Sequence, residues 1–304
     1  MTAQAGICAE PNLHAHYLFF NILPGHQSEV RNKLKAVPAL WRELADTYSN
    51  AAFSGLVAIG HQAWDELYPR QRPAELRAFP AQGEGERAAP ETPFDLFFQL
   101  RADRLDVAYI AVQKVMELLA GMVELKDERQ GFRYLDSRDM TGFVDGTENP
   151  QGEDRATVAL VAEGPFAGGS YVHVQRYHHR MARWQKLALK TQEDIYGRTK
   201  ADNIEYAAAD KPMTAHTRRT SLKDTNGNSM EILRQSMPWG SATEQGLVFI
   251  SCCRTPLHFT RMLESMYRRD EQGNFDHLTL FTRAETGAAF FAPSENWLLS
   301  QGDA

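Results

Sequence analysis

Hydrophobic and polar positions follow two periods along the first half of the chain. Alternation with a period of two is typical of strands, and a spacing of three or four is typical of helices. On this basis strands are expected at 16–23, 53–59, 94–100 and 123–135, and helices at 28–48, 64–67 and 104–120. Pro38 is expected to bend the first helix, and Gly121 can end the last. The stretch 79–93 is rich in Pro, Gly and charge, which predicts a loop.

The second half has a similar but looser pattern. Residues 157–162 and 170–177 are expected to form a hairpin around Gly168-Gly169. Further strands are expected at 230–236 and 246–253, helices at 182–189, 191–196 and 257–267, and short closing elements at 278–281 and 288–292. The polar run 197–228 shows no regular pattern.

The order of these elements indicates the fold class. The first half reads β-α-β-(α)-β-α-β, which is the ferredoxin-like order of an antiparallel sheet with helices on one face. The second half repeats it loosely. We therefore predict an α+β protein with a duplicated ferredoxin-like fold, antiparallel sheets and helices packed outside. The predicted boundary lies near 138–142, which gives an N-terminal half at 1–140 and a C-terminal half at 141–304.

Composition narrows the class of protein. The 304 residues are 43% hydrophobic and 24% charged, with a net charge of −6. These values suit an ordinary soluble protein of one large domain or two domains of about 150 residues. The net negative charge argues against sequence-independent binding of nucleic acid, which needs clustered Lys and Arg. No stretch approaches the roughly 20 apolar residues of a membrane span.

Cysteine usage and the N-terminus bear on the compartment. Cys8, Cys252 and Cys253 are odd in number and form no Cys-x-x-Cys pair. This pattern excludes a disulfide framework and a cysteine-rich zinc site, and it suits a reducing compartment. The N-terminus shows no basic region followed by an apolar run, so no secretory signal is expected. The sequence therefore favours the cytoplasm.

The stretch 142–150, Gly-Phe-Val-Asp-Gly-Thr-Glu-Asn-Pro, carries the densest candidate chemistry. Asp145-Gly146 is a turn dipeptide, because Asp can bond its own backbone and Gly tolerates positive φ. Phe143 and Val144 lead directly into Asp145, which suggests a carboxylate held near a core. A polar surface loop is the alternative, since such turns are common.

Two other side chains are candidates because of their surroundings. His216 lies in the irregular run, near no other His and just before Arg218 and Arg219. A zinc-type site needs several converging ligands, whereas haem iron needs only one axial ligand. Arg234 lies in an apolar strand, where a buried charge requires a partner, and Asp145 is the candidate partner if the two halves face each other. The alternatives are a surface histidine and an edge-strand arginine that faces water.

Two adjacent pairs, His178-His179 and Cys252-Cys253, are expected to be structural. Both pairs fall in predicted strands. Neighbouring strand residues point to opposite faces, so neither pair can chelate one ion together.

Taken in order, these residues resemble the dye-decolorising peroxidase family, and most closely its bacterial B-type branch. The resemblance rests on Asp145 within the long motif at 142–150, on His216 followed by arginine, and on Arg234 within Arg-Gln-Ser-Met-Pro. It extends over Gly-Gly-Ser-Tyr-Val-x-Val-Gln-Arg at 168–176, Gly-Arg-Thr-Lys at 197–200 and Phe-Ala-Pro-Ser at 291–294. It therefore spans nearly the whole chain. The short form Gly-x-x-Asp-Gly is weak alone, but the long form followed by His and Arg is highly specific.

The resemblance implies one haem b per chain, held mainly by the C-terminal half, with His216 as the axial ligand of the iron. Asp145 and Arg234 would stand on the opposite, distal side. Ser236 occupies the place where some relatives carry Asn, and its hydroxyl could bond a distal water. The other cofactor contacts implied are Leu247 and Phe249 in the distal wall, Arg198 at a propionate, Thr147 and Glu148 beside the cofactor, and Asp276 on the second nitrogen of His216.

The activity implied is a peroxidase that reduces hydrogen peroxide through a ferryl intermediate and oxidises dyes, phenols or other one-electron donors. Asp145 could shuttle the proton and Arg234 could stabilise developing charge. Free Asp titrates near ~3.9, so activity should favour acidic pH unless burial raises the pKa of Asp145. Bulky dyes would give up electrons at surface Tyr or Trp side chains. A homo-oligomer is expected, with no nucleic-acid or membrane partner.

Three other functions stay open from the sequence. A haem-handling protein, which removes iron from haem or oxidises porphyrinogens, would use the same residues. A chlorite-splitting haem enzyme is disfavoured by the Asp145-Gly146 motif. A structural or binding protein without a cofactor is the third alternative.

Overall fold

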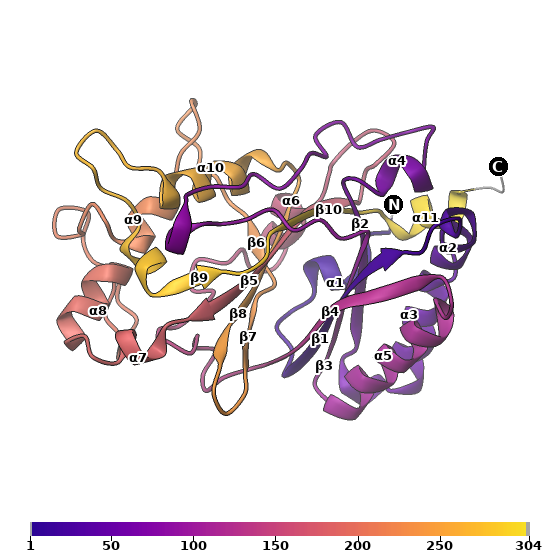
Figure 1. Cartoon of the computed structure of the whole chain (residues 1–304), viewed down its shortest axis with the longest axis horizontal. Helices are drawn as coiled ribbons and strands as arrows, with labels where there is room; N and C mark the ends of the chain where they lie inside the picture. The colour runs from indigo at the N-terminus through magenta and orange to yellow at the C-terminus, as the bar shows by residue number, and fades with distance from the viewer. Residues whose placement is uncertain (1, 302–304) are drawn as a thin grey trace.

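The computed structural model describes residues 2–301, and ten strands in this range form one antiparallel sheet (Figure 1). The strands are β1 (His14–Ile22), β2 (Ser54–Gly60), β3 (Leu96–Ala102), β4 (Val123–Phe132), β5 (Ser170–His179), β6 (Leu233–Arg234), β7 (Met237–Gly240), β8 (Gln245–Cys253), β9 (Thr282–Ala284) and β10 (Ala288–Ala292).

Eleven α-helices and three 3-10 helices complete the described part of the chain. The α-helices are α1 (Ala5–Cys8), α2 (Gln27–Leu34), α3 (Val37–Thr47), α4 (Trp64–Leu67), α5 (Leu105–Leu118), α6 (Asp154–Ala159), α7 (Met181–Trp184), α8 (Leu189–Tyr196), α9 (His216–Thr220), α10 (Leu257–Tyr267) and α11 (Glu295–Ser300). The 3-10 helices are η1 (Ser49–Ala51), η2 (Gly85–Arg87) and η3 (His277–Leu280). Within the described residues no helix is long and apolar enough to cross a membrane.

The strand order shows the duplication. It runs β4-β1-β3-β2-β10-β5-β8-β6, with β7 added on β8 and β9 on β5. The first four strands have the ferredoxin-like order fourth-first-third-second. The next four repeat that order if β5 is counted as the first strand of the second unit and β10 as its last. The predicted duplicated ferredoxin-like fold is confirmed, with the two sheets joined edge to edge.

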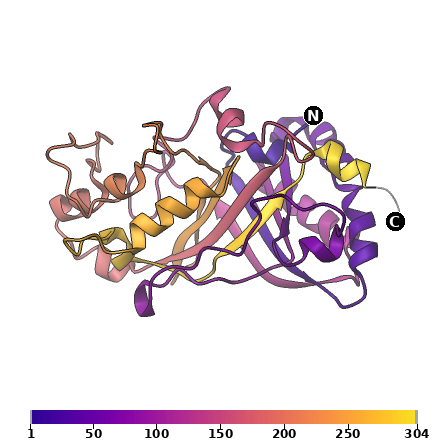
Figure 2. The ribbon, with the colours of Figure 1, turned by 90° about the horizontal axis from the view of Figure 1, so that it is seen from above.

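The joint between the two units is short. Strand β10 pairs with β2 through Phe290 opposite Gly60 and Phe291 opposite Ile59, and it pairs with β5 along its whole length. Figures 1 and 2 agree that α2, α3 and α5 lie toward one end of the long axis and α7 to α10 toward the other. The last described segment of the chain returns to the end of the molecule that carries α2 and α3, where α11 lies.

Alternation along the strands divides the apolar side chains between separate cores. In β1, Leu18 and Phe20 pack with the helices of the N-terminal unit, whereas Tyr17 and Phe19 face a core shared with the C-terminal unit. Val172 and Val174 of β5 belong to this shared core. The period of two therefore places the two faces of β1 in two different cores.

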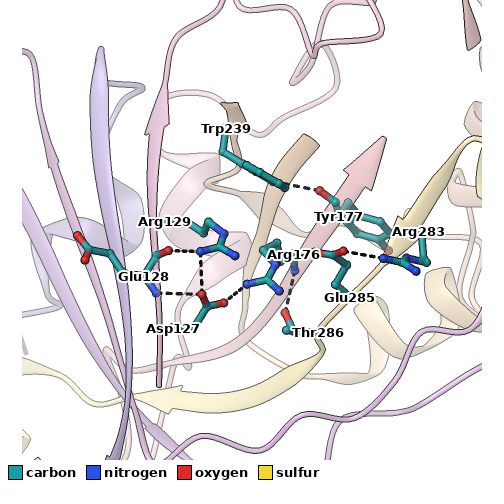
Figure 3. A network of polar contacts seen from close by, with 9 residues as sticks. All are labelled: Asp127, Glu128, Arg129, Arg176, Tyr177, Trp239, Arg283, Glu285 and Thr286. Carbon is teal, nitrogen blue, oxygen red and sulfur yellow. Dashed lines mark hydrogen bonds and ion pairs between the residues drawn. The ribbon is translucent and has the colours of Figure 1, made fainter. Parts of the chain in front are cut away.

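A network of charged side chains forms a second connection between the units (Figure 3). Arg176 of β5 contacts Asp127 of β4, and its Nε lies 2.9 Å from Glu285. Arg129 lies 3.0 Å from the same Asp127, and Arg283 lies 2.8 Å from Glu285. Because the side chains of Arg176, Asp127 and Glu285 are only 14–21% exposed, the contacts among these three are screened less than ordinary surface pairs.

Two local predictions are wrong for identifiable reasons. Residues 157–162, expected as a strand of a hairpin, begin with the last three residues of α6 and continue without regular structure. The first turn of α6 carries Asp154, where the helix dipole favours an acid. Strand β5 therefore has no hairpin partner before it. The single helix expected at 28–48 is two helices, because Pro38 lies in the first turn of α3 and starts a new helix there.

The joint at Phe291 gives a stability prediction. Its buried ring contacts Trp64, Phe166 and Tyr171 at centroid distances of 5.6, 5.5 and 5.0 Å. We expect Phe291→Ala to lower the free energy of unfolding by about 3–5 kcal/mol, because the substitution leaves a cavity at the joint between the two units. Equilibrium urea denaturation measures this change. The control Leu299→Ala, at a residue 52% exposed, should change it by less than about 0.5 kcal/mol, and equal effects would contradict the assignment.

Candidate active site

A cavity of about 370 Å³ lies against the face of β5 and β8 that is turned away from the shared core. This volume is in the range of small-molecule sites. Helix α10 contributes apolar side chains to its wall, and the loop around Asp145, helix α9 and strand β6 contribute polar ones. Of the residues expected at a site, the lining includes Asp145, Thr147, Glu148, Arg198, His216, Arg234, Leu247 and Phe249.

His216 begins α9 and is backed by a buried carboxylate. Its Nδ1 lies 2.6 Å from Oδ2 of Asp276, a residue with no exposed surface. The other oxygen of Asp276 accepts a hydrogen bond of 2.9 Å from the backbone N–H of Leu278. An ionised carboxylate only accepts hydrogen bonds, so Nδ1 carries the proton. In the neutral imidazole the lone pair then lies on Nε2, on a side chain that lines the cavity.

Asp145 and Arg234 come together from distant parts of the chain. Oδ1 of Asp145 lies 3.8 Å from Nε of Arg234, and each side chain keeps about a quarter to a third of its surface accessible toward the cavity that both line. The backbone N–H of Asp145 donates to the carbonyl of Ser137 over 2.9 Å. Burial raises the pKa of Asp145, although the positive charge of Arg234 opposes that shift.

Arg198 forms a charged corner of the cavity. It is 6% exposed, and its Nη2 lies 3.7 Å from the carboxylate of Glu148. Its Nε is buried without a hydrogen-bond partner among the described residues. Thr147 accepts a hydrogen bond of 2.7 Å from the side chain of Asn203 beside it. A buried N–H without a partner is costly, so this corner is suited to an anionic ligand group.

The remaining wall is apolar, and Ser236 is not part of it. Leu247 and Phe249 of β8 pack against Phe259 and Leu263 of α10, and all four side chains line the cavity. Among the described residues that line the cavity, Ser236 is absent. Its hydroxyl oxygen accepts a hydrogen bond of 3.1 Å from the backbone N–H of Ile250.

A buried polar network beside the cavity was missed by sequence reasoning. Nε2 of His179 lies 2.8 Å from Asp139, whose second oxygen accepts from the hydroxyl of Thr141 over 2.6 Å. The same hydroxyl oxygen lies 2.7 Å from Oη of Tyr196. Asp139, His179 and Tyr196 all line the cavity. The signal that could have revealed His179 is the alternation in β5, where Gln175, Tyr177 and His179 share one face.

Electrostatics keep Asp139 ionised inside this network. Burial alone would raise the pKa of Asp139, but the neighbouring His179 and the hydrogen bonds from His179 and Thr141 outweigh burial and lower that pKa to about 2. Asp139 and Asp145 therefore have pKa values shifted in opposite directions within one cavity. Opposed shifts of this kind separate a fixed charge from a group that can exchange a proton.

Comparisons with known proteins identify the family of the chain. The chain matches the family model of the Dyp-type peroxidase N-terminal part over residues 4–133 and that of the C-terminal part over residues 136–297. The dye-decolorizing peroxidase of Mycolicibacterium paratuberculosis is 38% identical over 288 residues, which are 93% of this chain and 81% of the relative.

Solved structures give the same result. A Dyp-type peroxidase protein of Shewanella oneidensis is 53% identical, with a TM-score of 0.97 and an alignment that covers 99% of each chain. A variant of DypB from Rhodococcus jostii RHA1, solved in complex with heme, is 33% identical with a TM-score of 0.91 and covers 96% of each chain. The chain therefore belongs to the Dyp-type peroxidase family, and its enzymatic class is that of a dye-decolorising peroxidase.

The lowered pKa of Asp139 predicts a specific pH dependence of stability. A carboxyl group with a folded-state pKa near 2 stabilises the fold above its ordinary pKa of about 3.9, and this stabilisation of about 2 kcal/mol is lost as the pH falls toward 2. We expect Asp139→Asn to lower stability at pH 7 and to flatten its dependence on pH between about 4 and 2. Urea denaturation at several pH values measures both effects. Asp46→Asn, at an exposed position, is the control, and an unchanged slope in Asp139→Asn would refute the prediction.

Proposed function

We propose that the cavity binds one haem b and that the enzyme uses it to reduce hydrogen peroxide while it oxidises dyes, phenols or other small one-electron donors. The observation that carries this proposal is the state of His216. Its Nδ1 is engaged by the buried carboxylate of Asp276, which leaves Nε2 as a free donor atom for a metal in a cavity that also holds Asp145 and Arg234.

The residues present fit a haem. One wall is made of aliphatic and aromatic side chains from β8 and α10, which suits an apolar macrocycle. The buried and unpartnered Nε of Arg198 suits a propionate, with Thr147 and Glu148 beside it. A single imidazole is sufficient as protein ligand to haem iron. The heme complex of the Rhodococcus relative supports the same choice of cofactor.

We assign cofactor binding to these residues. His216 would ligate the iron, and Asp276 would orient its ring and make it a stronger electron donor through the Nδ1 hydrogen bond. Leu247 and Phe249 would enclose the distal side. When bound, haem supplies the redox-active iron on which the peroxide O–O bond breaks and to which donors return electrons.

Asp145 and Arg234 would then act on the peroxide. An ionised Asp145 can take the proton from one peroxide oxygen and return it to the other, which makes the departing oxygen leave as water. The guanidinium of Arg234, 3.8 Å away, can stabilise the negative charge that develops as the bond breaks. Ser236 is a weaker candidate for this step, because its hydroxyl oxygen is engaged by the Ile250 N–H and does not line the cavity.

Three finer assignments complete the proposal. The enzyme would work in the cytoplasm, which agrees with three cysteines that are all free. It would form a homo-oligomer, of two or more chains. Donors too large for the cavity would deliver electrons at the surface through Tyr or Trp side chains.

The alternative of a haem-handling protein uses the same cavity and differs in outcome. Such a protein would bind haem and release iron or product without consuming peroxide. The pair of Asp145 and Arg234 favours peroxide chemistry, because simple storage of haem needs no proton-transfer group beside a cation.

The identity of the haem ligand is tested by absorption spectroscopy. We expect the haem-reconstituted wild type to show a sharp Soret band that changes after one equivalent of hydrogen peroxide, and His216→Ala to lose or alter that band, because the single protein ligand is gone. His178→Ala is the matched control, since His178 does not line the cavity. Haem that binds but ignores peroxide would support the haem-handling alternative, and no uptake of haem would refute the proposal.

The roles of the distal pair are tested by stopped-flow kinetics. We expect Arg234→Ala to slow the reaction with peroxide strongly, and Asp145→Asn to slow it by roughly 10²–10⁴-fold. In the wild type the rate should rise with pH through a value above the ordinary pKa of about 3.9, since burial raises the pKa of Asp145 and only the ionised form acts as a base. Asp145→Asn should lose this rise. A wild-type rate in Arg234→Ala would show that its assignment is wrong.

A further inference from the structure

Strand β6 has an edge that the sheet leaves open. It contains only Leu233 and Arg234 and pairs with β8 on one side. The backbone N–H of the next residue, Gln235, points to β8 and donates to the carbonyl of Ile250 over 2.9 Å. Because backbone groups of successive strand residues point in opposite directions, the N–H and C=O of Arg234 point away from β8.

The side chain of Asn149 occupies this open edge. Its Nδ2 donates to the carbonyl of Arg234 over 2.9 Å, and its Oδ1 accepts from the N–H of Arg234 over 2.8 Å. The primary amide thus satisfies both backbone groups of Arg234, as a neighbouring strand would. Among the side chains of similar length only an amide offers a donor and an acceptor together, and Asp offers two acceptors.

Asn149 is itself held in the turn that carries Asp145. Its backbone N–H donates to the carbonyl of Gly146 over 2.9 Å. Pro150 follows and restricts Asn149 to extended conformations. The amide therefore connects the segment of Asp145 to the strand of Arg234, which lies 85 residues away in the chain.

We propose that Asn149 is a positioning residue that sets the place of the Arg234 guanidinium relative to the Asp145 carboxylate. Asn149 does not belong to the described lining of the cavity, so it acts through the backbone of Arg234 and not by contact with substrate. The separation of 3.8 Å between the Arg234 and Asp145 side chains is then controlled by two backbone-directed hydrogen bonds. The consequence for catalysis rests on the proposed peroxidase mechanism.

The claim that Asn149 holds the backbone of Arg234 is tested in the protein without haem, by hydrogen exchange of the backbone N–H of Arg234. We expect Asn149→Ala to speed this exchange about tenfold, because the N–H of Arg234 loses its acceptor, the Oδ1 of Asn149. The rate is compared with that of the β5 amides that exchange only when the whole protein unfolds. Asn12→Ala is the matched control. Asn12 also bridges two segments, to Ala52 and Asp103 over 3.0 and 3.2 Å, but it lies in the N-terminal unit. Unchanged exchange at Arg234 in Asn149→Ala would refute the proposal.

The claim that Asn149 affects catalysis through Arg234 is tested by a double-mutant cycle in the haem-loaded protein. We expect Asn149→Ala to slow the peroxide reaction about 10–100-fold, as expected for a displaced catalytic group. It should slow Arg234→Ala no further, because the group that it positions is already absent. Asn12→Ala should leave the rate unchanged even where it lowers stability. Equal fold-losses in both backgrounds would show that Asn149 acts independently of Arg234 and would overturn the proposal.

Asn149→Asp adds a second readout, the dependence of the peroxide rate on pH. The new carboxylate still accepts a hydrogen bond from the N–H of Arg234, but it has no donor for the Arg234 carbonyl and repels it. It also adds negative charge near Asp145. The rise of the peroxide rate with pH should therefore move to higher pH in Asn149→Asp, and an unmoved profile would count against the assignment. If the wild type does not react with peroxide at all, the proposed function fails, while the hydrogen-exchange result still decides the structural claim.

Discussion

The cavity depends on strand β5, whose alternate side chains face two different environments. Val172 and Val174 are fixed in the core shared by both units, and the opposite face presents Gln175 and Tyr177 to the cavity. Strand β5 is hydrogen-bonded to β8 on one side and to β10 and β9 on the other. Moving its polar face would disrupt the apolar packing behind it. The cavity therefore gains its rigidity from a core that it does not contact.

Two buried carboxylates are stabilised by different sets of hydrogen bonds. Asp276 is fully buried and divides its oxygens between His216 and a backbone N–H, so its charge is directed at the imidazole. Asp139 is held by His179 and Thr141 and belongs to a closed network. An unpaired buried carboxylate would be far more costly than either arrangement. These hydrogen bonds allow charge to be kept close to an apolar cavity.

Sequence reasoning was most successful where a local pattern is sufficient. The strands of the N-terminal unit follow from alternation, and the fold class follows from the order of elements. It was wrong at residues 157–162, because a short apolar run of this kind suits a helix as well as a strand. The candidate site residues Asp145, His216 and Arg234 lie far apart in the chain. The need of a buried arginine for a partner paired Arg234 with Asp145, and only the family resemblance added His216 to them. Asn149 was overlooked because its partner is the backbone of another segment, which no sequence motif records.

The pair of Asp145 and Arg234 also shows why position and proton affinity cannot be separated in this cavity. Burial raises the pKa of Asp145, and the charge of Arg234 lowers it, so the affinity of the carboxylate for a proton depends on how closely the guanidinium approaches. A guanidinium that moved away would stabilise developing charge less and would also hold Asp145 protonated to higher pH. The proposed base and the proposed charge stabiliser would therefore act as one electrostatic unit, and any contact that fixes their separation would adjust both functions at once.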